Sequence, residues 1–291
     1  MTASRWAIPL ALAAVYLIWG STYLAIRFAL EGGFPPFLLG GIRFLIAGSI
    51  LFLVMRLRGV PMPTRVQWRN AAVMGVLLLL LGNGMVNVAE QSVSSGLTAV
   101  AIASAPLWMG IFATARGERL AALEWLGLAV GFAGVLWLNA GGELAASMTG
   151  LVALLVATIA WSFGSVWSRG RDLPSPFMAA AAQMLCGGVA MLVVGLAAGE
   201  RIHQWPSASA LGAFAYLVLI GSLVGYSAYV FLLHHVRPVL AGSYAYVNPV
   251  IAVALGAWLA GERFTAHDLG AMAVILAGVV IISIARLGRK K

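Results

Sequence analysis

Long runs of apolar residues dominate the chain, and short polar stretches that carry most of the charges separate them. A helix needs about 20 residues to cross the ~30 Å hydrocarbon core of a membrane. Membrane β-strands would instead show about ten residues of strict alternation, which these runs lack. The pattern therefore predicts an all-α membrane protein with ten transmembrane helices, at residues 6–26, 35–55, 71–89, 96–115, 125–140, 149–168, 177–199, 208–232, 239–260 and 269–285.

The composition agrees with a membrane protein and excludes several kinds of chemistry. Of the 291 residues, 62% are hydrophobic and 9% are charged, whereas a soluble domain has about 25% charged residues. The only lysines are Lys290 and Lys291, so a P-loop and a buried Schiff-base lysine are both excluded. One cysteine, Cys186, and four histidines without metal-site spacing predict no disulfide, no metal and no cofactor.

Positive charge is distributed unevenly between the predicted loops. If the N-terminus is cytoplasmic, 14 of the 18 Lys and Arg residues fall in cytoplasmic segments and two fall in outer loops, as the positive-inside rule requires. The first apolar run is longer than the roughly 7–15 residues of a signal-peptide core, so we expect it to stay as a helix. We therefore predict a multi-pass protein of the bacterial inner membrane with both termini cytoplasmic. Its basic loops would face anionic lipid headgroups rather than nucleic acid.

The chain repeats itself weakly at a spacing of about 142 residues. Trp19 precedes Arg27 by eight positions, as Trp161 precedes Arg169, and Pro106 and Pro249 fall in equivalent helices. The repeats cover residues 6–140 and 149–285. Each repeat has five predicted helices, an odd number, so the two copies would insert in opposite orientations around a central cavity. Inverted repeats are typical of secondary transporters, with the substrate near the midplane between the repeats.

Four further motifs stand out along the two repeats: Trp19-Gly-Ser-Thr-Tyr, Arg43-Phe-Leu-Ile-Ala, and the paired Ala105-Pro106…Gly117-Glu118-Arg119 and Asn248-Pro249…Gly261-Glu262-Arg263 segments. These segments resemble the EamA domain of the drug/metabolite transporter superfamily, present here as two copies over residues 10–285. The resemblance implies a ten-helix bacterial exporter, and some exporters of this kind carry aromatic amino acids. Members with the same motifs also transport drugs, nucleosides and other metabolites.

Neutral polar and aromatic residues gather at mid-membrane depth and are the candidate substrate contacts. Taken singly, such residues often only bond a neighbouring helix or fill the core, and together they favour a cavity lining. Glycine and proline at four positions are candidate hinges or kinks: Gly20, Pro106, Gly164 and Pro249. The candidate cavity residues are Trp19, Asn83, Asn87, Trp108, Trp161, Ser165, Tyr226, Tyr246 and Asn248.

Charged residues are rare within the predicted spans. Arg43 lies well inside one, and its repeat counterpart Gln183 favours a shared structural bond over a substrate contact, which stays the alternative. Arg27 is expected to pair with Glu31 at the outer rim. No carboxylate lies mid-span, and Glu90 is near a helix end, so we expect flux to follow the substrate gradient rather than a proton relay.

The sequence thus predicts a secondary transporter, not an enzyme, that exports small metabolites across the inner membrane by alternating access. Amino acids, aromatic or neutral, are the best candidates because of the resemblance. A multidrug exporter of the same fold fits an aromatic, neutral cavity equally well. An intramembrane enzyme is less favoured, because no span pairs a nucleophile with His or a carboxylate at helical spacing. No ATPase subunit is implied, and the oligomeric state is open.

Overall fold

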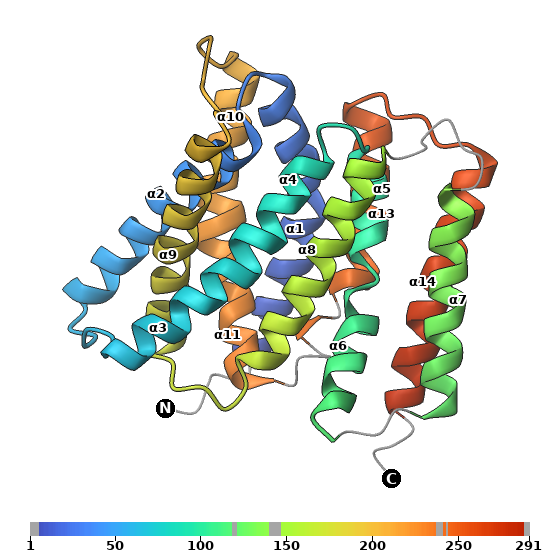
Figure 1. Cartoon of the computed structure of the whole chain (residues 1–291), viewed down its shortest axis with the longest axis horizontal. Coiled ribbons are helices and arrows are strands. Elements are labelled where there is room, and N and C mark those ends of the chain that lie inside the picture. The colour runs from blue at the N-terminus through green and yellow to red at the C-terminus, as the bar shows by residue number, and fades with distance from the viewer. Residues whose placement is uncertain (1–5, 118–120, 140–146, 237–240, 243, 288–291) are drawn as a thin grey trace.

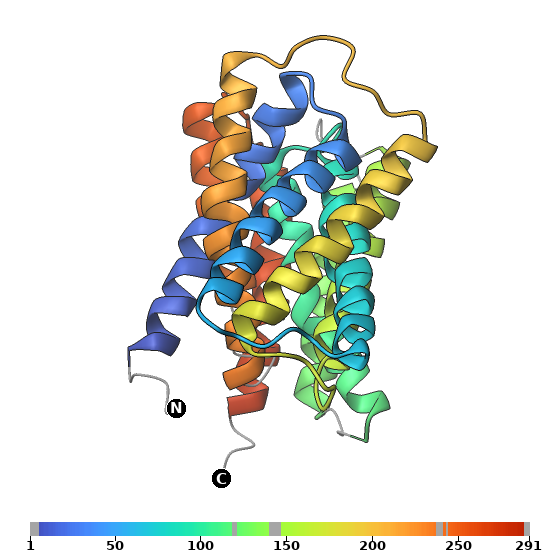
Figure 2. The same ribbon diagram turned by 90° about the vertical axis from the view of Figure 1, so that its left-hand side faces the viewer.

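The fold was obtained as a computed structural model, which describes residues 6–117, 121–139, 147–236, 241–242 and 244–287. These residues form a bundle of helices that contains no strand in the described ranges (Figure 1). The start of α1 and the end of α14 lie on the same side of the bundle, at the bottom of Figure 2. We call this the terminal end, and the opposite end, where α1 finishes, the far end.

The first half of the chain supplies the elements from α1 to α7. Three of them, α3, η1 and α4, continue one another as a single helix over Arg65–Ala89. The fourth predicted span is broken after Ile102, where Pro106 begins a new helix. The elements are α1 (Ala7–Glu31), α2 (Pro36–Leu57), α3 (Arg65–Met74), η1 (Gly75–Gly84), α4 (Met85–Ala89), α5 (Ser95–Ile102), α6 (Ala105–Ala115) and α7 (Ala122–Asn139).

The second half repeats this order. Here α10, η2 and α11 form one helix over Ala208–His235, and Pro249 lies inside α13 rather than at a break. The elements are α8 (Met148–Trp167), α9 (Pro176–Ala197), α10 (Ala208–Tyr216), η2 (Leu217–Tyr226), α11 (Ser227–His235), α13 (Tyr244–Leu259) and α14 (Ala266–Leu287).

Every predicted span overlaps a helix, but not all of these helices meet the requirements for crossing a membrane. Among the described residues, seven helices are long and apolar enough to do so. The apolar parts of α13 and α14 are shorter, over Val247–Leu259 and Ala266–Gly278. Seven membrane-capable helices support a multi-pass membrane protein, and the count of ten stays a prediction.

Local sequence explains where many helices start and stop. Ser94, Ser147 and Ser207 each accept a hydrogen bond from the backbone N–H three residues on, which caps the start of α5, α8 and α10. After α2 and α9 the chain turns through Gly59 and Gly199, at φ +76° and +80°. This conformation costs glycine little and other residues more.

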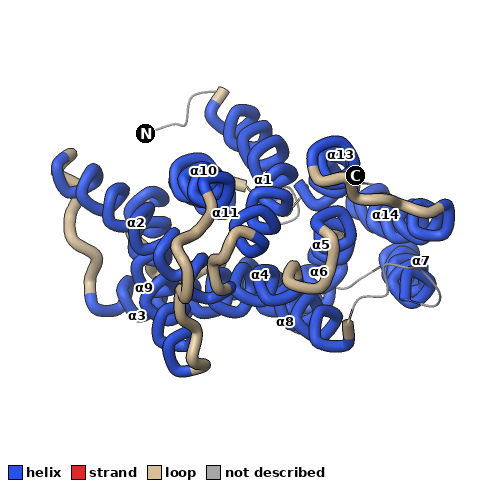
Figure 3. The backbone as a smooth tube through the Cα atoms, turned by 90° about the horizontal axis from the view of Figure 1, so that it is seen from above, coloured by secondary structure: helices blue, strands red, loops and turns tan. Residues whose placement is uncertain are grey.

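Equivalent helices of the two halves pack against each other. The helix α2 runs along α9, and a Cβ added at Gly41 would lie only 2.6 Å from Leu192 Cδ2. The helix α7 runs along α14, where the backbones of Gly131 and Gly278 meet closely. Seen from above, these two pairs lie on opposite sides of the central helices (Figure 3). Small residues allow such close backbone approach in membrane helices.

Two π-helical segments occupy matching places. The segment η1 covers Gly75–Gly84, and η2 covers Leu217–Tyr226, which is the same stretch moved by 142 residues. Wider π turns are rare and often mark functional sites, because they shift side chains relative to an α-helix. Both segments pass the centre of the bundle, and both contribute to the cavity described next.

Candidate functional site

A small cavity lies in the middle of the bundle, between the two halves. The space open to the centre of a water molecule is about 50 Å³, enough for about three or four waters. No carboxylate lies among the described residues that line it. The lining residues with polar or aromatic side chains include Trp19, Tyr23, Arg43, Asn83, Trp161 and Tyr244.

Aromatic rings form a packed layer along one side of this cavity. The rings of Trp19 and Trp161 meet edge to face, with centroids 5.3 Å apart. Trp19 also lies 4.9 Å from Tyr244 and 5.0 Å from Tyr229, centroid to centroid. The two tryptophans, which are equivalent in the repeats, therefore touch each other in this conformation and do not lie on opposite walls of an open path.

Each tryptophan packs against a glycine in the π-helix of the other half. A Cβ added at Gly82 in η1 would lie 2.8 Å from Trp161 Cε3, and one at Gly225 in η2 would lie 2.7 Å from Trp19 Nε1. The indole of Trp19 also donates to the carbonyl of Gly221. Each half thus supplies the tryptophan for one contact and the glycine for the other, as expected for two repeats related by a two-fold axis. The missing side chains at the two glycines make room for the indole rings.

Tyr229 belongs to this layer, although the sequence did not single it out. It is fully buried in α11, and its hydroxyl accepts a hydrogen bond from Trp161 Nε1 at 3.0 Å. The same hydroxyl bonds Ser165 Oγ at 2.8 Å. Tyr229 follows Tyr226 by three residues, which puts both on one helix face, and this spacing was the available signal.

Arg43 lines the cavity, and only 3% of it is exposed. One guanidinium nitrogen, Nη2, donates to Asn83 Oδ1 at 3.1 Å. The equivalent position, Gln183, accepts from Tyr226 in the second half, at 2.7 Å. The expected structural bond between equivalent helices is therefore present in both halves, but it uses only part of the Arg43 side chain.

Five other predicted cavity residues are not among the residues that line the cavity: Asn87, Trp108, Ser165, Tyr226 and Asn248. Asn87 is fully buried and donates to the carbonyl of Pro36, which ties helix α4 to the start of α2. Asn248 is buried, and its amide, in the orientation that satisfies both neighbours, donates to the Tyr16 and Tyr244 carbonyls. Trp108, in α6, is half-buried and outside the lining. Tyr246 belongs to α13, but its side chain is outside the described part of the structure.

Three of the four predicted hinge positions lie at close contacts or at a helix start, and the fourth, Pro249, lies inside α13. A Cβ at Gly20 would meet Ile251 of α13 at 2.8 Å, and one at Gly164 would meet Leu77 at 3.0 Å. Both helices continue through these glycines. Pro106 lies in the first turn of α6, just after the break in the helix. Movement at these positions stays a prediction.

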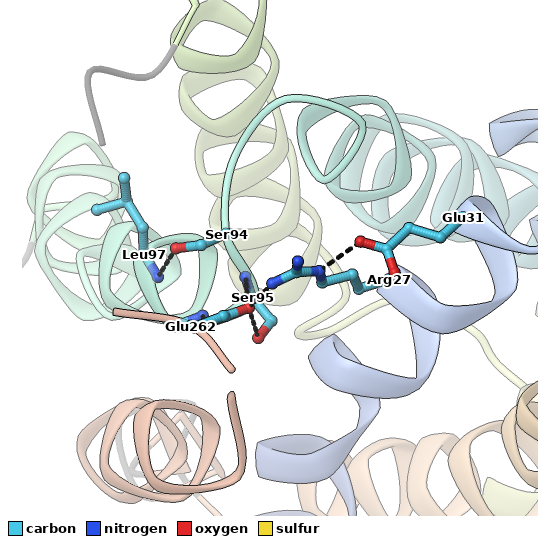
Figure 4. A network of polar contacts seen from close by, with 7 residues as sticks. Arg27, Glu31, Ser94, Ser95, Leu97 and Glu262 are labelled. Atoms are coloured by element: carbon cyan, nitrogen blue, oxygen red, sulfur yellow. Dashed lines mark hydrogen bonds and ion pairs between the residues drawn. The ribbon is translucent and has the colours of Figure 1, made fainter. Parts of the chain in front are cut away.

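At the far end, an ion-pair network joins three parts of the chain (Figure 4). Arg27 bonds Glu31, as expected from their spacing, and also Glu262. Glu262 in turn accepts from the backbone N–H and hydroxyl of Ser95, at 3.0 and 2.7 Å. Its carboxylate therefore sits at the start of α5, where the helix dipole favours negative charge. This network, with Glu262 only 3% exposed, closes the far end between α1 and α5.

Glu90 lies close to this network and is buried, with 6% of it exposed. It follows directly after the spanning helix that ends at Ala89. Neither carboxylate oxygen has a hydrogen-bond partner. Burial raises the pKa of the Glu90 carboxyl well above its usual range, and Glu262 raises it further, while Arg27 and Arg43 act in the opposite direction.

A wider pocket lies toward the terminal end, where α8 and α11 finish and α9 begins. The space in it that is open to the centre of a water molecule is about 570 Å³, compared with about 50 Å³ in the central cavity. The wide pocket and the ion-pair network thus lie at opposite ends of the bundle. Among the described residues, no three His, Cys, Asp or Glu side chains come together as a metal site. The pocket lining includes Met74, Arg169, Arg171, Gln183, His234 and His235.

Several proteins of similar sequence are named as transporters. The chain is 44% identical over 277 residues to YedA of Escherichia coli K12, named an uncharacterised inner membrane transporter, covering 95% of this chain and 90% of that one. It is 26% identical over 284 residues to the uncharacterised transporter YvbV of Bacillus subtilis, covering 94% and 90%. A solved crystal structure has the same fold, with a TM-score of 0.72 at 22% identity, over 97% of this chain and all of that one.

Both halves of the chain also match one protein family separately. The EamA-like transporter family matches residues 5–140 and again residues 148–284. The matches agree with the resemblance seen in the sequence motifs, and the named relatives are transporters rather than enzymes. The chain is therefore a multi-pass membrane transporter that belongs to the EamA-like transporter family.

Proposed function

We propose that this protein exports small amphipathic metabolites, with neutral and aromatic amino acids as the main substrates, through the central cavity. The observation that carries the proposal is the cavity itself, which lies between the two halves and is lined by aromatic rings, neutral hydrogen-bonding groups and Arg43. Such a lining suits a zwitterion with an apolar side chain, because rings attract both apolar groups and ammonium ions.

Transport would proceed by alternating access. The far end is closed by Arg27, Glu262 and Ser95, and the wide pocket lies toward the terminal end. The central space holds about three or four waters, so the two halves must move apart to admit an aromatic amino acid. A substrate entering from the wide side would pass the aromatic layer, and release would require the far-end network to open.

The orientation follows from charge. With ten spans, two inverted five-helix repeats and both termini cytoplasmic, the wide pocket faces the cytoplasm and the ion-paired end faces outward. The exchange of Trp–Gly contacts between the halves supports this inverted arrangement. Entry from the cytoplasm and release outside would make the protein an exporter.

Transport by the purified protein in liposomes tests the proposal. Liposomes loaded with an unlabelled amino acid should take up the labelled compound by exchange, for neutral and aromatic amino acids and with a proton ionophore present. The panel includes cationic dyes, because the aromatic lining also suits flat cations. Uptake of dyes without amino acids would favour a multidrug exporter. Loss of amino-acid flux with the ionophore would contradict transport driven by the substrate gradient alone.

A further inference from the structure

Arg43 is a buried charge whose hydrogen bonds are mostly unmade. A guanidinium has five N–H donors and no acceptor. Among the described residues Nη2 bonds Asn83 Oδ1, while the buried Nε and Nη1 atoms have no hydrogen-bond partner there. The guanidinium also lies over the ring of the neighbouring Phe44, 4.3 Å from Cζ to the centroid.

Such a charge is costly at membrane depth. Arginine within a spanning segment is strongly unfavourable, and it almost always faces a cavity and pairs with another group. Among the described residues no carboxylate lies within ion-pair distance of Arg43. Glu90 is near enough to act on it electrostatically, but both Glu90 oxygens are without hydrogen bonds.

A purely structural role does not account for an arginine here. In the second half the equivalent bond, from Tyr226 to Gln183, joins the corresponding helices with a neutral amide. Glutamine at position 43 could likewise bond the Asn83 amide without burying a charge. Compared with glutamine, Arg43 therefore has a charge and N–H donors that the bond to Asn83 does not explain. These groups lie in the wall of the central cavity, where a ligand could pair with them.

We propose that Arg43 binds the carboxylate of the transported molecule, and that a carboxylate is required for recognition. Nε and one Nη nitrogen of arginine form a fork that matches a carboxylate in two parallel hydrogen bonds. Nε and Nη1 are shut off from solvent in this conformation, so the carboxylate reaches them when the two halves move apart. The assignment rests on the proposed transport of small metabolites through this cavity, and it deepens that proposal by naming the recognised group.

The rest of the cavity suits the other end of an amino acid. Trp19, Trp161 and Tyr244 offer ring faces to an ammonium or an apolar side chain. Asn83 holds the guanidinium by its Oδ1 atom, so it is a positioning residue for Arg43. A compound that keeps the side chain and the amine but lacks the carboxylate leaves Arg43 unpaired and loses its main anchor.

Competition in liposomes tests this requirement, with the wild-type protein and four related compounds as probes. Phenylalanine and 3-phenylpropionate carry a carboxylate, whereas phenylalaninamide and phenethylamine do not. The first two should compete with labelled phenylalanine at least about tenfold better than the last two, the loss expected for one buried charged hydrogen bond. Equal competition by all four would overturn the role of Arg43 and leave the transport function standing. If neither phenylalanine nor leucine is transported at all, the proposed function fails, and this inference fails with it.

Variants separate recognition from folding. In Arg43→Gln the preference for carboxylates over amides should disappear, while Gln183→Ala, which breaks the equivalent bond in the other half, should keep it. Asn83→Asp places a carboxylate beside Arg43, so it should block carboxylate substrates by occupying the guanidinium while leaving the unfolding temperature unchanged or higher. An Asn83→Asp protein that still prefers phenylalanine over its amide would contradict the proposal.

Discussion

Trp161 connects three features of the site: it lines the cavity, packs on Gly82 and donates to Tyr229. Truncation to alanine would leave a large hole and cost about 3–5 kcal/mol, so it would mix loss of fold with loss of function. Phenylalanine keeps most of the ring volume but removes the N–H donor and part of the cavity wall.

We expect Trp161→Phe to lower amino-acid flux in liposomes by roughly tenfold, the effect of losing one buried hydrogen bond and its positioning of Tyr229. The matched control is Trp205→Phe, at a tryptophan that is 85% exposed and remote from the cavity. Flux through the Trp205 variant should stay near that of the wild type. Equal losses in the two variants would place the substrate path elsewhere.

The buried Glu90 carboxyl leads to a prediction about how the stability of the protein changes with pH. Its pKa is raised on folding, so below its unfolded value of about 4.5 both states hold the proton. Above that value only the unfolded state releases it, and stability therefore falls as pH rises toward the folded pKa. The slope reaches up to about 1.4 kcal/mol per pH unit.

The unfolding temperature of the detergent-solubilised protein, followed from pH 5 to pH 8, checks this. Glu90→Gln should flatten the fall, because the amide does not titrate. Glu31→Gln is the control, since the Glu31 side chain is 56% exposed, and its profile should keep the wild-type slope. An unchanged slope in Glu90→Gln would assign the pH dependence to another group.

At the scale of elements, the π-helical segments η1 and η2 shape the cavity by bringing glycines under the two indole rings. The Gly82→Ala change puts a methyl group 2.8 Å from Trp161 Cε3, so the ring must shift. Overpacking of this kind costs about 1–3 kcal/mol. We expect lower flux together with a lower unfolding temperature.

Gly212→Ala is the matched change, because an added Cβ there meets nothing within 4 Å. It should leave flux intact and raise helix stability by up to about 1 kcal/mol. Transport kinetics and thermal unfolding of both variants, side by side, measure this difference. Wild-type flux in Gly82→Ala would show that the position of Trp161 does not limit transport.

The positions of the helices were more predictable from the sequence than the contacts between them. Apolar runs between charges locate helices well, because a membrane span must be long and uncharged; α8 covers Met148–Trp167 where 149–168 was predicted. The helix ends shift where polar residues continue the helix beyond the apolar run, as at Arg65, six residues before the predicted start. Nothing in the apolar pattern distinguishes a π-helical turn from an α-helical one.

The candidate site was predicted in part, for a physical reason. The repeat points to Trp19 and Trp161, which do line the cavity, but contact between them depends on how the halves pack. Asn87 has the same polarity as Asn83, and only the structure separates a helix tie from a lining residue. The Arg27–Glu262 bond joins residues 235 positions apart, beyond the reach of local spacing rules.

At the scale of the whole molecule, the proposed inverted topology makes a prediction about which positions a reagent outside the cell can reach. With Cys186 replaced by alanine, single cysteines at Arg58 and Lys291 should resist an impermeant thiol reagent in intact cells, and one at Glu143 should react. Labelling after membrane disruption provides the control for reactivity. Reaction at position 58 in intact cells would reverse the orientation and undermine the assignment as an exporter.

The central claim is that substrate passes through the central cavity by alternate opening of the two ends, and the far-end network offers the most direct test. In a protein without Cys186, cysteines replacing Arg27 and Glu262 can be joined by a short, reducible bifunctional thiol reagent that spans the position of the ion pair. Exchange of labelled phenylalanine in liposomes should stop in the cross-linked protein and return on reduction, while each single-cysteine variant keeps its flux after the same treatment. Undiminished exchange with the far end locked would contradict the account.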